Sequence, residues 1–409
     1  MGKEICFFIP TPLTARDYKR FGVELLQSQG FKVTFLDITR LMNQEYLSNY
    51  QPELASYKNV MVFESRKDIL TFFEKNNKDM FVIIFSAVNW CNLFVYQALK
   101  KHKINYAVFH ANAYPSPDFI MSNEHKTNIV NHIKKLTKIK NFNKHMVYQL
   151  LRMKMALFQK LPNYLLGIRP PQYVFAGGFK SLVGLSKRWG NVKKMWAHTL
   201  DYDLYLDIKL KDRLPLVTTD YALFLDEYLP FHPDCFVTGG PPIPYKNPKT
   251  YYDHLNKMFD IIENKFGIPV VIAANPRSQY QSKPDCFNGR QIVKDATPDL
   301  IAHASCVFLH GSTSVNCAVL FRKPIIFLMP LEIENDGFYL PHYLALSREL
   351  NKQLLDMDML QNIDIQKETQ VDEKIYSSFV EAYIKTLNSP KKYFWEIVAN
   401  TIGGKNEHF

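Results

Sequence analysis

The sequence lacks an apolar run long enough to cross a membrane as a helix. Its longest run, residues 81–88, has the length of a buried strand. The apolar stretch near the amino terminus, residues 5–9, is too short for a secretory signal and is followed at once by Pro10. Together with a composition of 47% hydrophobic and 22% charged residues, these absences predict a cytoplasmic, globular protein.

The sequence also lacks the spacings of a metal site. Its six cysteines are scattered without a close pair, and no H-x-x-x-H element occurs among its 12 histidines. Several cysteines lie in apolar runs, which favours buried free thiols. No G-x-G-x-x-G fingerprint follows the first predicted strand, so nothing supports a dinucleotide there. We therefore predict neither a metal nor a cofactor.

Acidic residues are missing from one long segment. Between residues 125 and 200 there are 15 Lys and Arg and no Asp or Glu. The charge of +15 in this segment exceeds the net charge of +11 of the whole chain, so the rest of the chain is slightly acidic. The positive charge is therefore local. A local basic region predicts an anionic partner.

Part of this basic region, residues 123–160, is predicted to be helical, because apolar side chains recur there at spacings of three and four. In the plainer interpretation it is a domain helix with a solvated basic face. In the other, it contacts an anionic membrane surface or a lipid-linked acidic acceptor. The residues expected to face this acceptor or membrane are Lys134, Lys138, Lys144 and Arg152.

Short apolar strands alternate with amphipathic helices along the chain, which is typical of doubly wound parallel sheets. In the first half, the predicted strands are 3–10, 31–38, 60–63, 80–85, 106–110 and 192–197, and the main helices are 15–29, 67–75 and 91–101. In the second half, the predicted strands are 222–225, 269–274, 290–293, 306–309 and 324–328, and the helices are 250–266, 298–303, 315–322, 340–355, 373–387 and 392–401.

The length of 409 residues exceeds what one ordinary core accommodates, so two domains are expected. We predict an α/β fold in which two Rossmann-like, doubly wound domains face a cleft. The first domain would span residues 1–205, including the basic segment 125–200, and the second would span 206–390. Residues 201–215 are interpreted as the linker, and a last helix within 391–409 would return to the first domain.

One βαβ unit contains the clearest candidate for a ligand site. Its strands, 306–309 and 324–328, enclose a helix that is preceded by the turn His310-Gly311-Ser312-Thr313-Ser314. Such a turn offers hydroxyls and backbone N–H groups to a phosphate. The alternative is that Ser312 only caps the helix.

Two more strand ends in the second half carry polar clusters. Asp226-Glu227 offers paired carboxylates, and Asn275-Pro276-Arg277 offers a guanidinium suited to phosphate. Ligands of open α/β sheets bind beyond the carboxyl ends of the strands, so the three clusters are expected to converge. Converged, they could hold a phosphate and place a carboxylate near an electrophilic carbon.

Each of these residues also has a structural interpretation. Asp226 and Glu227 could cap a turn or pair with cations, and Arg277 could be a surface charge. His310 could be a buried, hydrogen-bonded histidine, and His232 could be an ordinary loop residue.

The order FLDEYLPFHPD, VVIAANPRS, FLHGSTSVNCAVLFRKPIIF resembles the C-terminal domain of GT-B glycosyltransferases of bacterial surface polysaccharide biosynthesis. It looks most like the group of sialyltransferases and Kdo transferases, over residues 220–328. The resemblance implies that Asp226 or Glu227 supplies the general base and that Ser312, Thr313 and Ser314 grip the nucleotide phosphate. It also implies a metal-independent reaction.

The sequence departs from this family at position 275, where Asn stands in place of the histidine that acts on the donor phosphate. An amide can donate a hydrogen bond but cannot become a cation. Either Arg277 or another histidine compensates, with His232 counted among the catalytic candidates, or the donor chemistry differs, or activity is lost.

The sequence thus predicts a glycosyltransferase that moves a sugar from a nucleotide-sugar donor to a surface glycan or a lipid-linked acceptor. A CMP-linked acidic sugar is favoured as donor over a UDP-sugar. No nucleic acid is expected as a partner, whereas peripheral contact with an anionic membrane stays open. Two alternatives remain: a sugar-nucleotide epimerase of the same fold, and a non-catalytic binder of acidic glycan or membrane.

Overall fold

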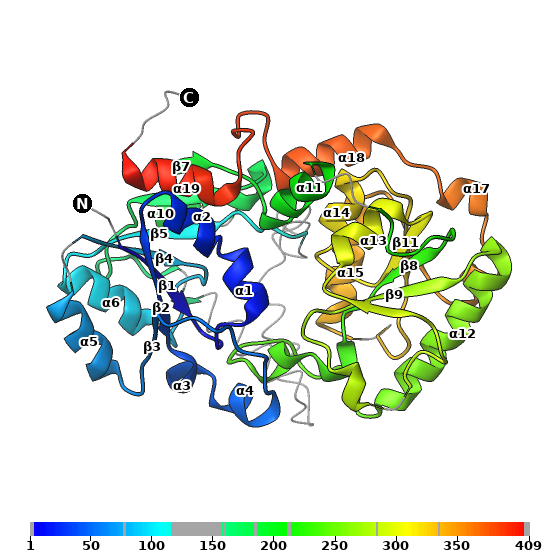
Figure 1. The fold of residues 1–409 in the computed structure, drawn as a ribbon, viewed down its shortest axis with the longest axis horizontal. Helices are drawn as coiled ribbons and strands as arrows, with labels where there is room; N and C mark the ends of the chain where they lie inside the picture. The colour runs from blue at the N-terminus through cyan, green and yellow to red at the C-terminus, as the bar shows by residue number, and fades with distance from the viewer. Residues whose placement is uncertain are drawn as a thin grey trace, which may run out of the picture.

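Two parallel sheets lie side by side in the computed structural model (Figure 1), which describes residues 4–76, 79–115, 157–158, 160–183, 186–210, 214–283, 285–333 and 336–404. One sheet has seven strands and the other has six. Every strand pair in both sheets is parallel. The predicted two-domain, Rossmann-like α/β fold is confirmed.

The first sheet has the order β3-β2-β1-β4-β5-β6-β7. Its strands are β1 (Glu4–Ile9), β2 (Lys32–Asp37), β3 (Val60–Val62), β4 (Met80–Ile84), β5 (Asn105–His110), β6 (Tyr173–Ala176) and β7 (Lys193–Trp196). The helices of this half are α1 (Ala15–Arg20), α2 (Val23–Ser28), α3 (Thr39–Met42), α4 (Gln44–Asn49), α5 (Arg66–Lys75), α6 (Leu93–Lys101), α10 (Ser186–Trp189) and α11 (Leu200–Leu210).

Alternate residues of β1 serve two different cores. Cys6 and Phe8 join the cluster covered by α5 and α6, whereas Phe7 joins the cluster covered by α2 and the last helix. A strand buried on both faces must be apolar throughout, which explains why the first strand reads as a continuous hydrophobic run.

The helix predicted over residues 15–29 is two helices, and that part of the prediction is wrong. Gly22 separates α1 from α2 with a φ of +56°, a left-handed conformation that favours glycine. A Cβ atom at this position would lie 2.2 Å from the indole of Trp395. The helix is interrupted because a side chain from the far end of the chain packs against its backbone.

The second sheet has the order β10-β9-β8-β11-β12-β13. Its strands are β8 (Ala222–Leu225), β9 (Val270–Ala274), β10 (Ile292–Lys294), β11 (Cys306–Leu309), β12 (Ile325–Leu328) and β13 (Leu354–Leu355). Its helices are α12 (Pro248–Phe266), α13 (Thr297–His303), α14 (Val315–Leu320), α15 (Tyr339–Glu349), α16 (Met357–Gln361), α17 (Ile365–Glu368) and α18 (Glu373–Phe379), which continues into a π-helical turn, Val380–Ile384.

The carboxyl end of the helix predicted over 340–355 is wrong. The helix ends at Glu349, Asn351 has a φ of +51°, and Leu354 and Leu355 pair with β12 as a sixth strand. Both leucines are buried in the core of the second domain. The energetic gain of an added strand outweighs the helical pattern of the preceding residues.

Most of the predicted linker, residues 201–215, is helical, because α11 runs from Leu200 to Leu210. Asn316 at the start of α14 donates a hydrogen bond to Asp201 (2.9 Å), and Tyr205 packs edge-on against Phe321. Helical structure here depends on partners more than a hundred residues away. This explains why the local sequence does not reveal it.

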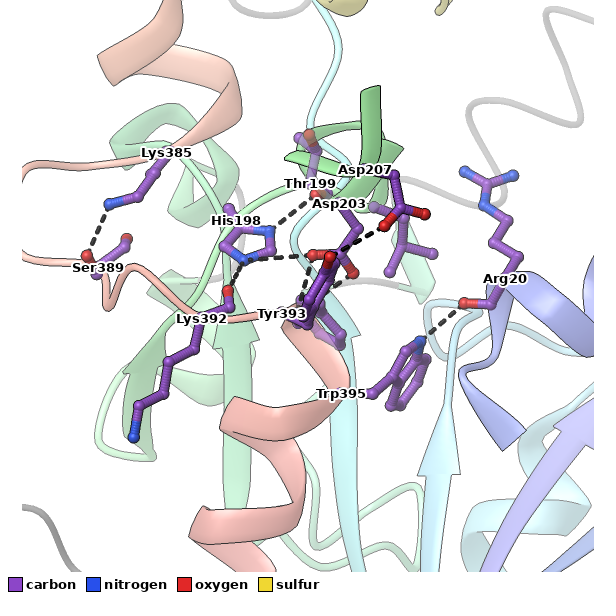
Figure 2. Close-up of polar contacts among 12 residues, drawn as sticks. Arg20, His198, Thr199, Asp203, Asp207, Lys385, Ser389, Lys392, Tyr393 and Trp395 are labelled. Carbon is purple, nitrogen blue, oxygen red and sulfur yellow. Dashed lines mark hydrogen bonds and ion pairs between the residues drawn. The ribbon is translucent and has the colours of Figure 1, made fainter. Parts of the chain in front are cut away.

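The last helix, α19 (Phe394–Gly403), packs on the first sheet (Figure 1). Figure 2 shows the polar contacts where the chain returns: His198 lies between two carbonyl oxygens, that of Thr199 (2.9 Å) and that of Lys392 (2.7 Å). Asp203 accepts the backbone N–H of Phe394 at 3.0 Å. The outgoing and returning crossings between the domains are therefore fastened to each other.

Most of the basic helix predicted over 123–160 lies outside the described residues, and so do Lys134, Lys138, Lys144 and Arg152. Of the helices that are described, none is both long and apolar enough to cross a membrane.

Candidate functional site

A cavity of about 220 Å³ lies where the two domains meet, at the carboxyl ends of β8 and β9. The first domain contributes two arginines of α1 to its wall. The lining residues are Arg16, Arg20, Leu225, Asp226, His232, Asp234, Ala273, Ala274, Asn275, Pro276, Arg277, Thr297, Ser312, Thr313 and Ser314. The structure thus brings together most of the residues that the sequence singled out.

The turn after β11 lines the cavity with three hydroxyl-bearing residues. The N-cap position of α14 belongs to Ser314, whose side chain makes no capping hydrogen bond. The Ser312 hydroxyl accepts the N–H of Ser314 at 3.3 Å and does not reach further into the helix. This contact with the N–H two residues on is that of a capping serine, so Ser312 caps the turn that leads into α14 and also lines the cavity.

Asp226 lies at the end of β8 and is 4% exposed. One carboxylate oxygen accepts the N–H of Tyr228 (2.8 Å), and the other accepts the N–H of Asn275 (3.2 Å) and the hydroxyl of Tyr280 (2.9 Å). Burial raises its pKa to about 6, against the lowering effect of these hydrogen bonds. Asp226 ties the end of β8 to the turn after β9.

Glu227 points to a different place and does not line the cavity. It accepts the N–H of Gly311 at 2.6 Å and has a longer contact, 3.4 Å, with the hydroxyl of Tyr343. Tyr114 of the first domain donates to the carbonyl of the same Gly311, so Glu227 faces the boundary between the domains. Burial and the neighbouring Asp226 raise its pKa to about 7.

Asn275 and Arg277 form a tight turn after β9. The side-chain oxygen of Asn275 accepts the N–H of Arg277 at 2.9 Å, so this amide shapes the turn. The guanidinium of Arg277 forms an ion pair with Asp234. Arg277 is therefore a fixed cation in the cavity wall and not an isolated surface charge.

His232 begins the short turn that carries Asp234. Its Nδ1 accepts the N–H of Asp234 at 3.2 Å, and the carboxylate of the same residue lies 3.8 Å away. Burial lowers the pKa of His232, as do the charges of Arg277 and Arg16, while Asp234 opposes them. The ring lines the cavity in its neutral form near pH 7.

His310 and Gly311 do not reach the cavity, which corrects their assignment to the phosphate site. His310 is fully buried, with Nδ1 2.8 Å from the carbonyl of Leu328 and Nε2 3.2 Å from the hydroxyl of Tyr251. Burial lowers its pKa to about 4. Its alternative interpretation, a hydrogen-bonded core histidine, is the correct one.

The sequence does not point to Arg16 and Arg20, because the polar clusters that follow its strands and mark the site all lie in the second half. They are four residues apart and share one face of α1, the helix that follows β1. The sheet order reverses between β1 and β4, and ligands of such sheets bind at that point. Burial and the charges of Arg20 and Arg277 together lower the pKa of Arg16 to about 10, against the raising effect of Asp17.

No group of three or more His, Cys, Asp or Glu that could hold a metal ion occurs within the part of the chain that the structure describes. The described cysteines are all free.

No protein-family model matches the sequence, and no curated protein matches it. Among solved structures, a UDP-GlcNAc 2-epimerase from Methanocaldococcus jannaschii is similar, with 13% identity over 99% of this chain and 100% of that one, and a TM-score of 0.50. MurG from Acinetobacter baumannii is 10% identical over 98% and 100% of the two chains, with a TM-score of 0.46. The structural neighbours are thus UDP-GlcNAc 2-epimerases and GT-B glycosyltransferases, and at these identities the likeness concerns the fold.

Proposed function

We propose that the protein is a glycosyltransferase that binds the phosphate of a nucleotide sugar in the cavity between the domains. One observation carries the proposal: Arg16, Arg20 and Arg277, from two domains, surround the same cavity as four Ser and Thr residues. Arginine binds phosphate through two parallel hydrogen bonds, and hydroxyls add neutral donors. Besides burial, the charges of Arg20 and Arg277 lower the pKa of Arg16, so the guanidinium groups repel one another and a phosphate would relieve the repulsion.

The two adjacent carboxylates have different roles in this proposal. Asp226 is held by three hydrogen bonds and positions the turns that form the cavity. Glu227 is held by one short hydrogen bond and one long contact, and it faces the first domain, where the acceptor would bind. A pKa near 7 suits a general base at neutral pH, so Glu227 would remove the proton of the acceptor hydroxyl.

The alternative function is that of an epimerase, because a structural neighbour with a TM-score of 0.50 is a UDP-GlcNAc 2-epimerase. An epimerase of this fold would need acid and base groups from both domains around one sugar. Within the described residues, the first domain lines the cavity with Arg16 and Arg20 and with no carboxylate or histidine. This composition supports the transferase.

The finer identity of the substrates rests on the motif resemblance to sialyltransferases and Kdo transferases. It favours a CMP-linked acidic sugar as donor, with a UDP-sugar as the other candidate. The acceptor would be a surface glycan or a lipid-linked saccharide at the inner face of the cytoplasmic membrane. The excess of arginines in the cavity is compatible with a donor that carries a carboxylate besides its phosphate.

Peripheral membrane contact is part of this proposal. Leu157, Tyr164 and Leu165 are 63%, 75% and 63% exposed, and Trp90, which packs on Phe158, is 54% exposed. Exposed Leu, Tyr and Trp beside a sequence rich in Lys and Arg suit the interface of an anionic bilayer. Vesicles with anionic lipid should bind the protein, and added salt should release it; salt-insensitive binding, or none, would contradict this contact.

The test of the function is incubation with CMP- and UDP-sugars and a mixture of saccharide acceptors. Released nucleotide together with a glycosylated acceptor would support transfer. An isomerised donor would support the epimerase, and silence with every donor would support a binding protein without activity.

A further inference from the structure

His198 is fully buried at the junction of the two domains and does not line the cavity. It lies on the outgoing crossing, which leads from β7 into α11, and the returning crossing leads from the π-helical turn to α19. The crossings are paired: His198 forms an antiparallel bridge with Lys385, and the N–H of Thr199 donates to the carbonyl of Ile384 at 2.9 Å. A movement of one domain relative to the other therefore bends both crossings at this point.

Both ring nitrogens of His198 face oxygen atoms that can only accept a hydrogen bond. Nδ1 lies 2.9 Å from the carbonyl of Thr199, and Nε2 lies 2.7 Å from the carbonyl of Lys392 (Figure 2). A neutral ring has one N–H, so its other nitrogen would direct a lone pair at a carbonyl oxygen. The geometry of these contacts therefore requires a proton on each nitrogen, which makes the ring an imidazolium cation.

The carboxylate of Asp203 supplies the opposite charge. It lies 3.6 Å from Nε2 of His198, and both of its oxygens accept the backbone N–H of Phe394, at 3.0 and 3.2 Å. A buried cation is costly unless it is paired, and this arrangement makes the two residues neutral as a whole.

Burial acts on the two partners in a way that keeps one shared proton. It lowers the pKa of His198, and it raises the pKa of Asp203 to about 8 against the lowering effect of the Phe394 N–H. The pair therefore holds one exchangeable proton at pH 7 and releases it near pH 8. In a coupled pair this proton belongs to both groups, and here the two carbonyl oxygens favour its place on the ring.

The neighbouring charged and titratable groups come from both crossings. The charge of Lys385 opposes the cation, but its Nζ donates to the carbonyl of Ser389 at 2.6 Å. Asp207 opposes the carboxylate, but it accepts the hydroxyl of Tyr393 at 2.9 Å. The other such groups are Asp201 and Tyr202 on α11, and Lys392, whose Nζ lies 3.9 Å from Glu396.

We propose that His198 and Asp203 form a buried imidazolium–carboxylate pair that fastens the two crossings at neutral pH and loosens them when its proton is lost in alkaline solution. Without that proton, a ring lone pair faces a carbonyl oxygen and Asp203 keeps an uncompensated charge. A histidine in the opened chain has its ordinary pKa of 6.5. The stabilisation is therefore full below about pH 6.5 and is lost as the pH rises through 8.

The first test is amide hydrogen exchange of residues 385–403 in the full chain, corrected for the intrinsic rate. Protection should fall by about 20-fold between pH 6 and pH 9, because the pair binds its proton roughly 30-fold more tightly than a free histidine. His198→Gln and Asp203→Asn should show lower protection that no longer changes over this range. The matched control is Asp207→Asn, on the same helix, which keeps an oxygen acceptor for Tyr393 and should retain the pH dependence.

The second test is NMR of the full-length protein with ¹⁵N-labelled histidine. At pH 7.5 one of the 12 histidines should still carry protons on both nitrogens, lose one of them near pH 8, and be missing from His198→Gln. The wild-type titration is decisive even where a variant does not fold. The absence of a doubly protonated ring at pH 7.5, or constant wild-type protection from pH 6 to pH 9, would overturn the proposal, whatever reaction the cavity catalyses.

Discussion

The two walls of the cavity differ in how firmly hydrogen bonds and ion pairs hold their side chains without a ligand. On the wall of the second domain, Asp226 binds the turn at Asn275, Arg277 is paired with Asp234, and Asp234 fixes His232. On the wall of the first domain, Arg16 has only a 3.6 Å contact with the adjacent Asp17. Figure 2 shows the backbone carbonyl of Arg20 accepting the indole N–H of Trp395 (2.7 Å), and no ion pair of the Arg20 guanidinium with another described residue is found.

The comparison suggests that one wall is preorganised and the other is completed by the ligand. Preorganised donors stabilise a developing charge without rearrangement, which favours catalysis. Loosely held cations gain more from binding an anion, which favours affinity and closure of the two domains. Variants of the two walls should therefore separate effects on turnover from effects on binding.

The largest effect is expected for Glu227→Gln. Loss of the general base should lower kcat by about 100-fold or more, while the affinity for the nucleotide stays within a factor of a few, because Glu227 does not line the cavity. Steady-state kinetics and calorimetry measure the two quantities. If Glu227→Gln keeps full turnover and Asp226→Asn loses it, the base is Asp226 and the assignment must be reversed.

A second effect concerns the cost in folding stability of burying the Glu227 carboxylate. The folded pKa of Glu227 is raised to about 7 from 4.5, so its contribution to stability is full below about pH 4.5 and is lost as the pH rises through 7. The difference corresponds to about 3 kcal/mol. As the pH rises from 5 to 8, the Tm of Glu227→Gln should increase relative to the Tm of the wild type.

The exposed Glu373 provides the control for this pH dependence, because Glu373→Gln should follow the wild type at every pH. Parallel curves for Glu227→Gln and the wild type would show that the Glu227 carboxylate is not destabilised by burial.

A smaller effect is expected on the other wall. Arg20→Gln should weaken nucleotide binding by roughly 30-fold, since hydrogen bonds to charged groups contribute about 1.5–3 kcal/mol. It should also reduce the salt dependence of binding. Lys19→Gln, exposed on the same helix and outside the cavity, should bind as the wild type does. Equal affinities of the two variants would remove the first domain from the nucleotide site.

The smallest effect is expected for Ser312→Ala combined with Thr313→Ala. These neutral donors lie on the preorganised wall, and their loss should weaken nucleotide affinity by about fivefold. Calorimetry with CMP and UDP is the measurement, and unchanged affinity would contradict a phosphate grip by this turn.

The sequence predicts the fold well because hydrophobic periodicity reports on local structure. It also identifies the strand ends at Asp226, Arg277 and Ser312, which do converge on one cavity. It fails where a side chain can point either way at the end of a strand. His310 turns into the core, and no local pattern distinguishes this from an outward direction.

The other features that the sequence does not predict depend on contacts between segments that are distant in the chain. Arg16 and Arg20 reach the cavity only through the mutual orientation of the domains, and α11 forms against α14. His232 was a candidate in the sequence, but the proton position at its ring depends on the fold of the turn that contains Asp234.

The contact between Gly22 and Trp395 also constrains the order of folding. The first sheet ends at Trp196, but its core includes Phe394 and Trp395, which pack against residues such as Phe7. During synthesis the part of this sheet face that α19 covers is therefore exposed until almost the whole chain has been made, while α2 already covers the rest. Any split of this chain into separately expressed halves should retain residues 394–403 with the first half.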